Sequence, residues 1–213
     1  MIKNILFDVD GTIWDSTAVV AKAWVKAAAE LGLPTEEISA ERLKKEFGKT
    51  MQDIFESIFP AQTNSELFAK LQNLLYVYEH EFLEANEEDL TYPKMRETME
   101  RLSQEYNLYI VSNCQLGYIE QVCGKTGITE LIKDFTCFGE TQKPKNESIE
   151  ILIDRNNLVK EECVYVGDIR GDEVSAHKAG IAFAHAKWGF GIAEEPEFVA
   201  DLFETLPEVL KNA

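Results

Sequence analysis

The chain has 213 residues, of which 45% are hydrophobic and 28% are charged, a composition typical of a globular protein with a buried core and unlike that of a disordered or fibrous chain. Its 21 basic and 38 acidic residues give a formal net charge of −17, which repels nucleic acids and anionic membranes. The longest apolar runs, such as residues 74–78, are far shorter than the roughly 20 residues that cross a bilayer. We therefore expect neither a nucleic-acid nor a membrane partner.

The start of the chain and its cysteines predict the compartment. Residues 1–4 lead directly into an apolar strand, without the apolar stretch and small-residue cleavage site of a secretory signal. The cysteines lie too far apart for a zinc clamp or a redox motif; they are Cys114, Cys123, Cys137 and Cys163. A cytoplasmic protein with reduced thiols is expected, as a monomer or a homodimer.

Short apolar runs alternate with stretches of helical spacing. The first run, residues 5–7, stops at acidic and glycine residues, as expected of a strand that is buried on both faces of a parallel sheet. Similar runs follow at residues 108–111, 135–138, 164–166 and 181–184. The alternation predicts an α/β protein with a doubly wound parallel sheet.

A helical insertion is predicted between the first two strands. The intervening segment is far longer than a simple crossover connection, and it contains an apolar stripe from Trp14 to Leu31 and a second one over residues 67–82. Shorter helices are expected over residues 40–47 and 51–59. We predict a helical cap at residues 15–90, inserted into an α/β core that comprises residues 1–14 and 91–213.

Two carboxylates follow the first strand. Asp8 and Asp10 lie where open α/β sheets bind ligands, and alternation directs both side chains to the same side. Like charges this close require a cation between them or a retained proton, so the pair predicts a metal site, an acid/base pair or both. A turn with incidental acidic residues is the alternative.

Polar residues also follow three later strands. Ser112 and Asn113 offer a hydroxyl, an amide and backbone N–H groups at an expected helix N-terminus, which is an anion site. Lys143, before Pro144, supplies a cation, although Lys145 competes for the same role. Asp168 and Asp172 follow the apolar run at residues 164–166 and add two carboxylates. Hard oxygen ligands of this kind, without a cluster of histidine or thiolate ligands, favour magnesium.

In this order, the motifs resemble those of the haloacid dehalogenase superfamily of phosphohydrolases. The resemblance extends over the whole chain and includes the inserted helices, which are similar to the small helical cap of that superfamily. Residues 10–16, Asp-Gly-Thr-Ile-Trp-Asp-Ser, and residues 188–191, Trp-Gly-Phe-Gly, are most similar to the phosphoglycolate-phosphatase-like branch. The resemblance implies a Mg²⁺-dependent phosphatase that acts on a small phosphorylated metabolite.

The resemblance also implies roles for the acidic residues. Asp8 is the nucleophile that becomes an aspartyl-phosphate, and Asp10 is first the acid for the leaving group and then the base for water. Magnesium is held by Asp8, by the backbone carbonyl of Asp10 and by Asp168, while Asp172 orients the metal or its water.

Binding of the phosphoryl group is likewise implied by the resemblance. Ser112 and Lys143 bind its oxygens, and the backbone of Val9, Asp10 and Asn113 completes the cradle.

Departures from the family pattern leave the substrate open. Many phosphoglycolate-type members have lysine after the Ser-Asn pair, where this chain has Cys114, either a reactive thiol or a small packing residue. A nucleotidase and a pyrophosphatase remain alternatives, as does a non-catalytic binding protein on the same scaffold. A sugar phosphomutase is less favoured, because this chain has Val20 where that branch carries histidine.

One basic segment stands out in the acidic cap. Arg42, Lys45 and Lys49 lie within residues 41–50, and a cap that closes over an anionic substrate needs such charges. The alternative is a solvated helix face. The histidines His80, His177 and His185 do not have the spacing of a metal site, and we interpret them as structural.

Overall fold

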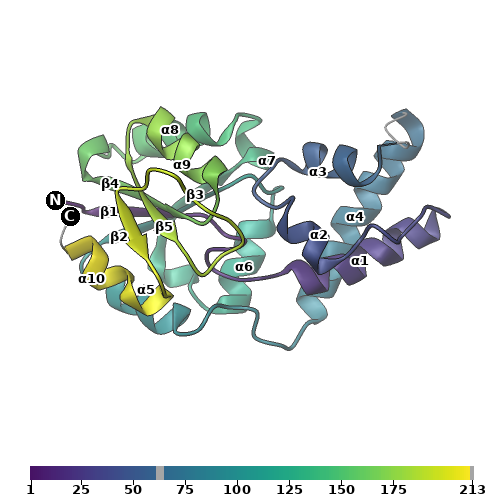
Figure 1. The fold of residues 1–213 in the computed structure, drawn as a ribbon, viewed down its shortest axis with the longest axis horizontal. Coiled ribbons are helices and arrows are strands. Elements are labelled where there is room, and N and C mark those ends of the chain that lie inside the picture. Colours follow the sequence, from purple (N-terminus) through teal and green to yellow (C-terminus); the bar gives the residue numbers. More distant parts are fainter. Residues whose placement is uncertain (61–64, 212–213) are drawn as a thin grey trace. The chain divides into compact units, whose positions relative to one another are not determined.

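The computed structural model describes residues 1–60 and 65–211, and the chain divides into two compact units. One unit comprises Met1–Trp14 and Thr91–Ala213, and the other comprises Asp15–Leu90. The sheet belongs to the first unit, whereas the described part of the second consists of helices and their connecting loops (Figure 1).

The first unit is built on a six-stranded sheet in the order β3-β2-β1-β4-β5-β6, in which every neighbouring pair is parallel. Its strands are β1 (Asn4–Phe7), β2 (Asn107–Ser112), β3 (Ile132–Cys137), β4 (Cys163–Gly167), β5 (Ala182–Ala186) and β6 (Phe198–Ala200). The predicted fold class is therefore confirmed. Sequence reasoning missed β6, which has only three residues.

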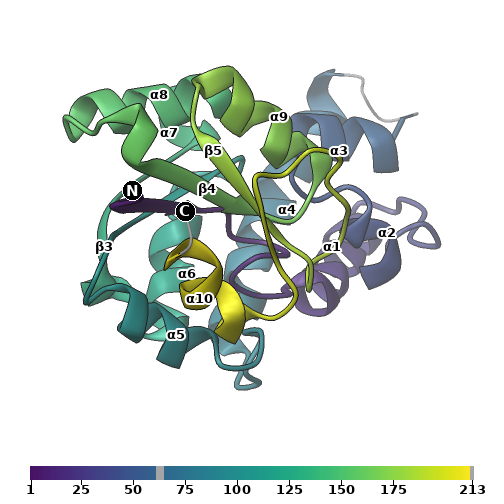
Figure 2. The same ribbon diagram turned by 60° about the vertical axis from the view of Figure 1, so that its left-hand side comes forward.

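Helices cover both faces of this sheet (Figure 2). One face carries α7 (Phe138–Thr141), α8 (Lys145–Arg155) and α9 (Arg170–Ala179), and the other carries α5 (Met95–Leu102), α6 (Tyr118–Thr126) and α10 (Leu206–Lys211). Alternation along β1 supplies both layers, because Leu6 joins the core beneath α8 and α9 while Phe7 stacks on Phe203 on the opposite face. Burial on both faces explains why the strands are continuous apolar runs.

The second unit contains α1 (Thr17–Glu30), α2 (Ala40–Lys44), α3 (Met51–Ile58) and α4 (Ser65–Ala85). The helix α1 packs along α4, and their shared core includes Trp24, whose indole lies edge-on to Phe55 and donates to Glu79 at 3.0 Å. Trp14 was expected to begin the first of these helices but belongs to the other unit, where it forms an isolated bridge with Thr91.

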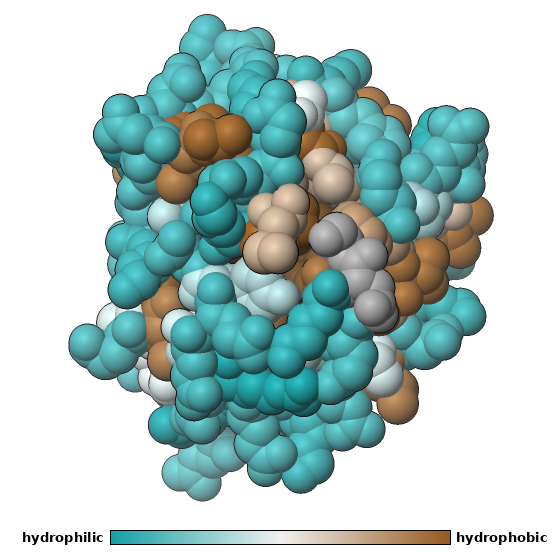
Figure 3. All heavy atoms as spheres, turned by 90° about the vertical axis from the view of Figure 1, so that its left-hand side faces the viewer, coloured by the Kyte–Doolittle hydropathy of each residue, from teal (hydrophilic) through white to brown (hydrophobic). Residues whose placement is uncertain are grey.

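Among the described residues, no helix is both long enough and apolar enough to cross a membrane. The face of the molecule drawn in Figure 3 is mainly hydrophilic, and its hydrophobic residues form small separate patches.

Candidate active site

Three of the predicted site residues lie at the carboxyl ends of the central strands. Asp8 follows β1, Ser112 is the last residue of β2, and Asp168 follows β4. Because β1 lies between β2 and β4 in a parallel sheet, these three strand ends share one edge.

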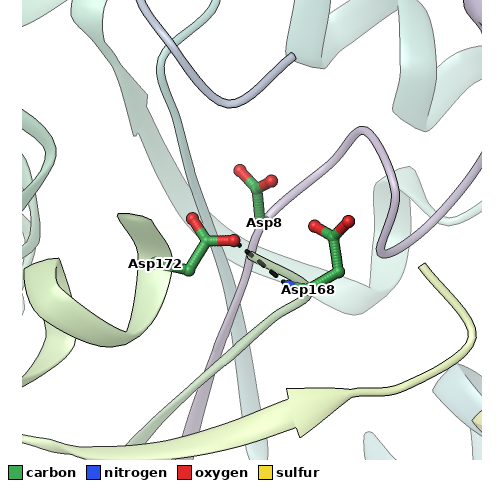
Figure 4. A group of neighbouring side chains, drawn as sticks. All are labelled: Asp8, Asp168 and Asp172. Carbon is green, nitrogen blue, oxygen red and sulfur yellow. Dashed lines mark hydrogen bonds between the residues drawn. The ribbon is translucent and has the colours of Figure 1, made fainter. Parts of the chain in front are cut away.

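Three buried carboxylates form a compact group at this edge (Figure 4). Asp8, Asp168 and Asp172 each offer an oxygen, and these oxygens all lie within 4.8 Å of one another. The Oδ2 atom of Asp172 accepts hydrogen bonds from the backbone N–H groups of Asp168 and Ile169, at 3.1 and 3.2 Å. The first turn of α9 therefore fixes Asp172 against the end of β4.

A buried lysine lies among these carboxylates, and it is not the predicted one. The Nζ atom of Lys145 is 3.0 Å from Oδ1 of Asp8 and 2.6 Å from Oδ1 of Asp172. Lys143 instead has a side chain that is 54% exposed and pairs with Glu147 on the same surface, at 3.5 Å. The structure therefore places Lys145, and not Lys143, beside Asp8 and Asp172.

The helix start explains the difference between the two lysines. Pro144 is the N-cap of α8 and Lys145 is its first residue, so the side chain of Lys145 is directed by a rigid element packed on the sheet. Lys143 precedes the proline in an exposed turn. The Lys-Pro dipeptide favoured Lys143, whereas the start of α8 at Lys145 decides which of the two side chains is buried.

The charges of this group fit a divalent cation. Three carboxylates and one ammonium leave two negative charges in a buried space. Burial raises the pKa of Asp8 to about 6, although the positive charge of Lys145 opposes this shift. Burial also raises the pKa of Asp168, and repulsion from the carboxylates of Asp172 and Asp8 adds to that increase. Burial opposes the charge of Lys145, but Asp172 and Asp8 raise its pKa well above the usual value. Hard oxygen ligands with unbalanced negative charge suit Mg²⁺.

The carboxylate of Asp10 contacts two aromatic residues. Its Oδ1 atom accepts hydrogen bonds from the hydroxyl of Tyr118 at 2.8 Å and from the indole N–H of Trp14 at 3.1 Å. The expected use of its backbone carbonyl as a metal ligand stays a prediction.

The segment after β2 differs from expectation. Ser112 is buried and Asn113 is half-buried, but α6 begins only at Tyr118, so the predicted helix N-terminus at the Ser-Asn pair is wrong. Burial also raises the pKa of Cys114 well above its ordinary value. Cys114 is therefore a buried packing residue and not a thiol activated by a helix N-terminus.

Two glycines allow the backbone to approach Asp168. A Cβ atom at Gly11 would lie 2.2 Å from Oδ2 of Asp168, and one at Gly189 would lie 2.3 Å from its Cβ atom. The same approach brings the N–H of Phe190 to within 2.7 Å of Oδ2. The Trp-Gly-Phe-Gly segment therefore closes over Asp168 and orients its carboxylate.

Two further residues, to which sequence reasoning gave no site role, contact Asp8 and the backbone of Asp168. The hydroxyl of Tyr165 donates to the carbonyl of Val111 at 2.6 Å and lies 3.5 Å from Oδ1 of Asp8. His185 is buried, with its Nε2 atom 3.2 Å from the carbonyl oxygen of Asp168. Tyr165 belongs to a uniformly apolar strand, so no local pattern marked it.

The basic segment of the helical unit is largely committed to internal ion pairs. Arg42 and Lys49 contact the buried carboxylate of Glu46, at 2.9 and 2.6 Å. Lys45 is exposed. Contact between these three residues and a substrate stays a prediction.

Comparison with known proteins supplies the family. Residues 5–186 match the family model described as haloacid dehalogenase-like hydrolase. This chain belongs to that family. The predicted family and hydrolase class are thereby confirmed.

Relatives of this hydrolase also match along nearly their whole length. It is 28% identical to the phosphoglycolate phosphatase of Vibrio cholerae serotype O1, with 98% of this chain and 97% of that one covered. It is 25% identical to the pyrophosphatase PpaX of Listeria innocua, with 99% and 97% covered.

Among solved structures, a predicted phosphoglycolate phosphatase from Haemophilus somnus 129PT superposes with a TM-score of 0.87. The two chains are 24% identical, and 98% of each is covered. At this identity, the likeness shows a shared fold.

Proposed function

We propose that this hydrolase is a Mg²⁺-dependent phosphatase that cleaves a small phosphomonoester through an aspartyl-phosphate on Asp8. The observation that carries the proposal is the buried group of Asp8, Asp168 and Asp172 around the ammonium of Lys145. The names of the relatives support the phosphatase class. In this proposal Asp15–Leu90 is the cap and the sheet unit is the catalytic core.

The proposed reaction has two displacements at phosphorus. An oxygen of Asp8 attacks, the bond from phosphorus to the ester oxygen breaks, and Asp10 gives its proton to the departing alkoxide. Water then attacks the phosphorus of the aspartyl-phosphate, Asp10 takes a proton from that water, and inorganic phosphate leaves while the Asp8 carboxylate is restored.

Positive charge serves both steps. The oxygens of the transferring group are bound by Lys145, which takes the role predicted for Lys143. Ser112 and the backbone of Asn113 bind the same oxygens. Asp8 and Asp168 would hold the metal, and Asp172 would hold or orient it. When bound, the metal supplies charge neutralisation at the phosphoryl oxygens.

The identity of the substrate is a separate proposal, more specific than the reaction class. Phosphoglycolate and pyrophosphate are both suggested by the names of relatives, and nucleoside monophosphates belong in the same comparison. A cytoplasmic location stays a prediction.

Steady-state assays test the proposal. Purified protein is tested with p-nitrophenyl phosphate, 2-phosphoglycolate, pyrophosphate and nucleoside monophosphates, in Mg²⁺ and in chelator. We expect hydrolysis that requires Mg²⁺ and falls by several orders of magnitude in Asp8→Asn, because the nucleophile is lost.

Asp154→Asn is the matched control, because Asp154 is an exposed residue of α8. It should retain wild-type rates. Activity in a chelated, metal-free protein contradicts the metal requirement, and near-normal turnover in Asp8→Asn contradicts the nucleophile.

A further inference from the structure

The carboxylate of Asp10 is held by two donors that converge on a single oxygen. The hydroxyl of Tyr118 and the indole N–H of Trp14 both donate to Oδ1, at 2.8 and 3.1 Å. Tyr118 is the first residue of α6, whereas Asp10 and Trp14 belong to the loop after β1. Residues more than a hundred positions apart in the chain therefore set the orientation of one side chain.

Both donors are themselves fixed. Trp14 is 2% exposed and Tyr118 is 4% exposed, and their rings meet edge to face with centroids 6.0 Å apart. The backbone carbonyl of Trp14 accepts from the N–H of Gly11 at 2.9 Å, and Trp14 also bridges to Thr91. Neither aromatic side chain can follow Asp10 if its carboxylate turns away.

Both donors belong to buried residues, so the loss of either bond carries a cost. A buried hydroxyl or indole N–H without an acceptor carries a desolvation penalty, so each donor favours the observed orientation of Asp10. Two donors on one oxygen reduce the rotational freedom of the carboxylate more than one would. A group that transfers protons depends on such fixed geometry.

We propose that Tyr118 and Trp14 are positioning residues that hold Asp10 for proton transfer to the leaving group. This role rests on the proposed phosphatase function. It has a consequence that a purely structural role lacks. An alkoxide leaving group needs a proton from Asp10, whereas p-nitrophenolate leaves without one, so loss of positioning slows only the first kind of ester.

Tyr118→Phe is the decisive variant because it removes the hydroxyl and keeps the ring packed on Trp14. We measure kcat/KM in Mg²⁺ for p-nitrophenyl phosphate and for the alkyl phosphate that the wild-type protein hydrolyses fastest. This ratio reports the steps up to phosphoryl transfer, in which Asp10 acts as the acid. We expect a decrease of about tenfold or more for the alkyl ester, part of the usual contribution of general acid catalysis, and an effect below about twofold for the aryl ester.

Trp14→Phe tests the second donor in the same way and should be selective in the same direction. Tyr106→Phe is the matched control, because Tyr106 directly precedes β2 and so lies at the opposite end of that strand from Ser112. The Tyr106→Phe variant should have the wild-type kcat/KM for both substrates. Thermal melts establish that each variant is folded.

The outcomes separate this role from the proposed function. A wild-type protein that hydrolyses none of these phosphates overturns the function and the role together. If the wild-type protein is active, three results for Tyr118→Phe overturn the positioning role alone. These are an unchanged kcat/KM, a higher kcat/KM, and a decrease by the same factor for both esters. Selective loss on the alkyl ester supports it.

Discussion

Lys143 and Lys145 are separated by one proline and have opposite environments. The side chain of Lys143 is 54% exposed, and that of Lys145 is 3% exposed between two carboxylates. An exposed ion pair contributes little, whereas a buried ammonium beside the proposed nucleophile would stabilise the negative charge of the transferring group.

We expect Lys145→Met to lower kcat about a hundredfold or more, the usual effect of removing one charge-stabilising donor from an active site. Lys143→Met should change it by less than about twofold, as for ordinary surface positions. Steady-state rates on p-nitrophenyl phosphate measure both, with circular dichroism to show that the variants are folded. Equal losses in the two variants would contradict the assignment of Lys145.

The loop that contains Gly189 closes over Asp168 and leaves no room for a side chain. A Cβ atom at Gly189 would lie 2.3 Å from the carbonyl oxygen of Gly11 as well as from Asp168. Backbone on one side and a buried carboxylate on the other cannot both shift without moving the site.

Gly189→Ala should therefore lower both the midpoint of thermal unfolding and the phosphatase activity. Gly124→Ala is the control, since Gly124 lies inside α6 and an added Cβ meets nothing within 4 Å. That variant should be neutral or more stable by up to about 1 kcal/mol, the helix preference of alanine over glycine. A Gly189→Ala protein with normal melting and activity would show that the loop tolerates displacement.

Helix α2 and helix α3 are joined through the buried carboxylate of Glu46. Its oxygens contact Arg42 and Lys49 and accept a hydrogen bond from Ser57 at 2.8 Å. Burial tends to raise the pKa of Glu46. The hydrogen bonds from Lys49 and Ser57 outweigh this effect and bring the pKa below the ordinary value of 4.5.

A lowered folded-state pKa means that this stabilisation is present above pH 4.5 and is lost as the pH falls through the folded value. Glu46→Gln should therefore cost about 1 to 3 kcal/mol at pH 7, as for hydrogen bonds to charged groups, and the difference from wild type should shrink below pH 4.5. Urea unfolding at several pH values measures this. Glu37→Gln, at an exposed loop position, should show no such difference, and a Glu46→Gln penalty independent of pH would contradict the interpretation.

The uncompensated charge of Asp8, Asp168 and Asp172 would link the proposed Mg²⁺ binding to the stability of the folded protein. A cation that binds only the native state stabilises it by about 2.7 kcal/mol when its concentration is a hundred times Kd. We expect Mg²⁺ to raise the unfolding midpoint relative to chelator, because it relieves repulsion within the group.

Asp168→Asn should weaken this Mg²⁺-dependent increase, while Asp154→Asn should keep it. Differential scanning calorimetry at matched ionic strength measures the increase independently of catalysis. An equal increase in both variants would place the bound Mg²⁺ elsewhere on this acidic protein.

The sequence by itself determined the sheet, the helical insertion and the chemistry of the strand ends. Short apolar runs such as residues 5–7 are typical of strands buried on both faces. Because the carboxyl ends of parallel strands meet at one edge, Asp8, Ser112 and Asp168 were predictable as neighbours. The family motifs added the expected reaction.

Only the tertiary structure decided which of two nearby lysines faces Asp8 and which groups hold Asp10. Lys145 is directed inward because α8 begins there and packs on the sheet, whereas a dipeptide pattern favoured Lys143. Tyr118 reaches Asp10 because α6 begins five residues after Asn113 and not at it. Sequence pattern assigns residues to strand ends, but the direction of a side chain depends on where the next helix starts and on what packs against it.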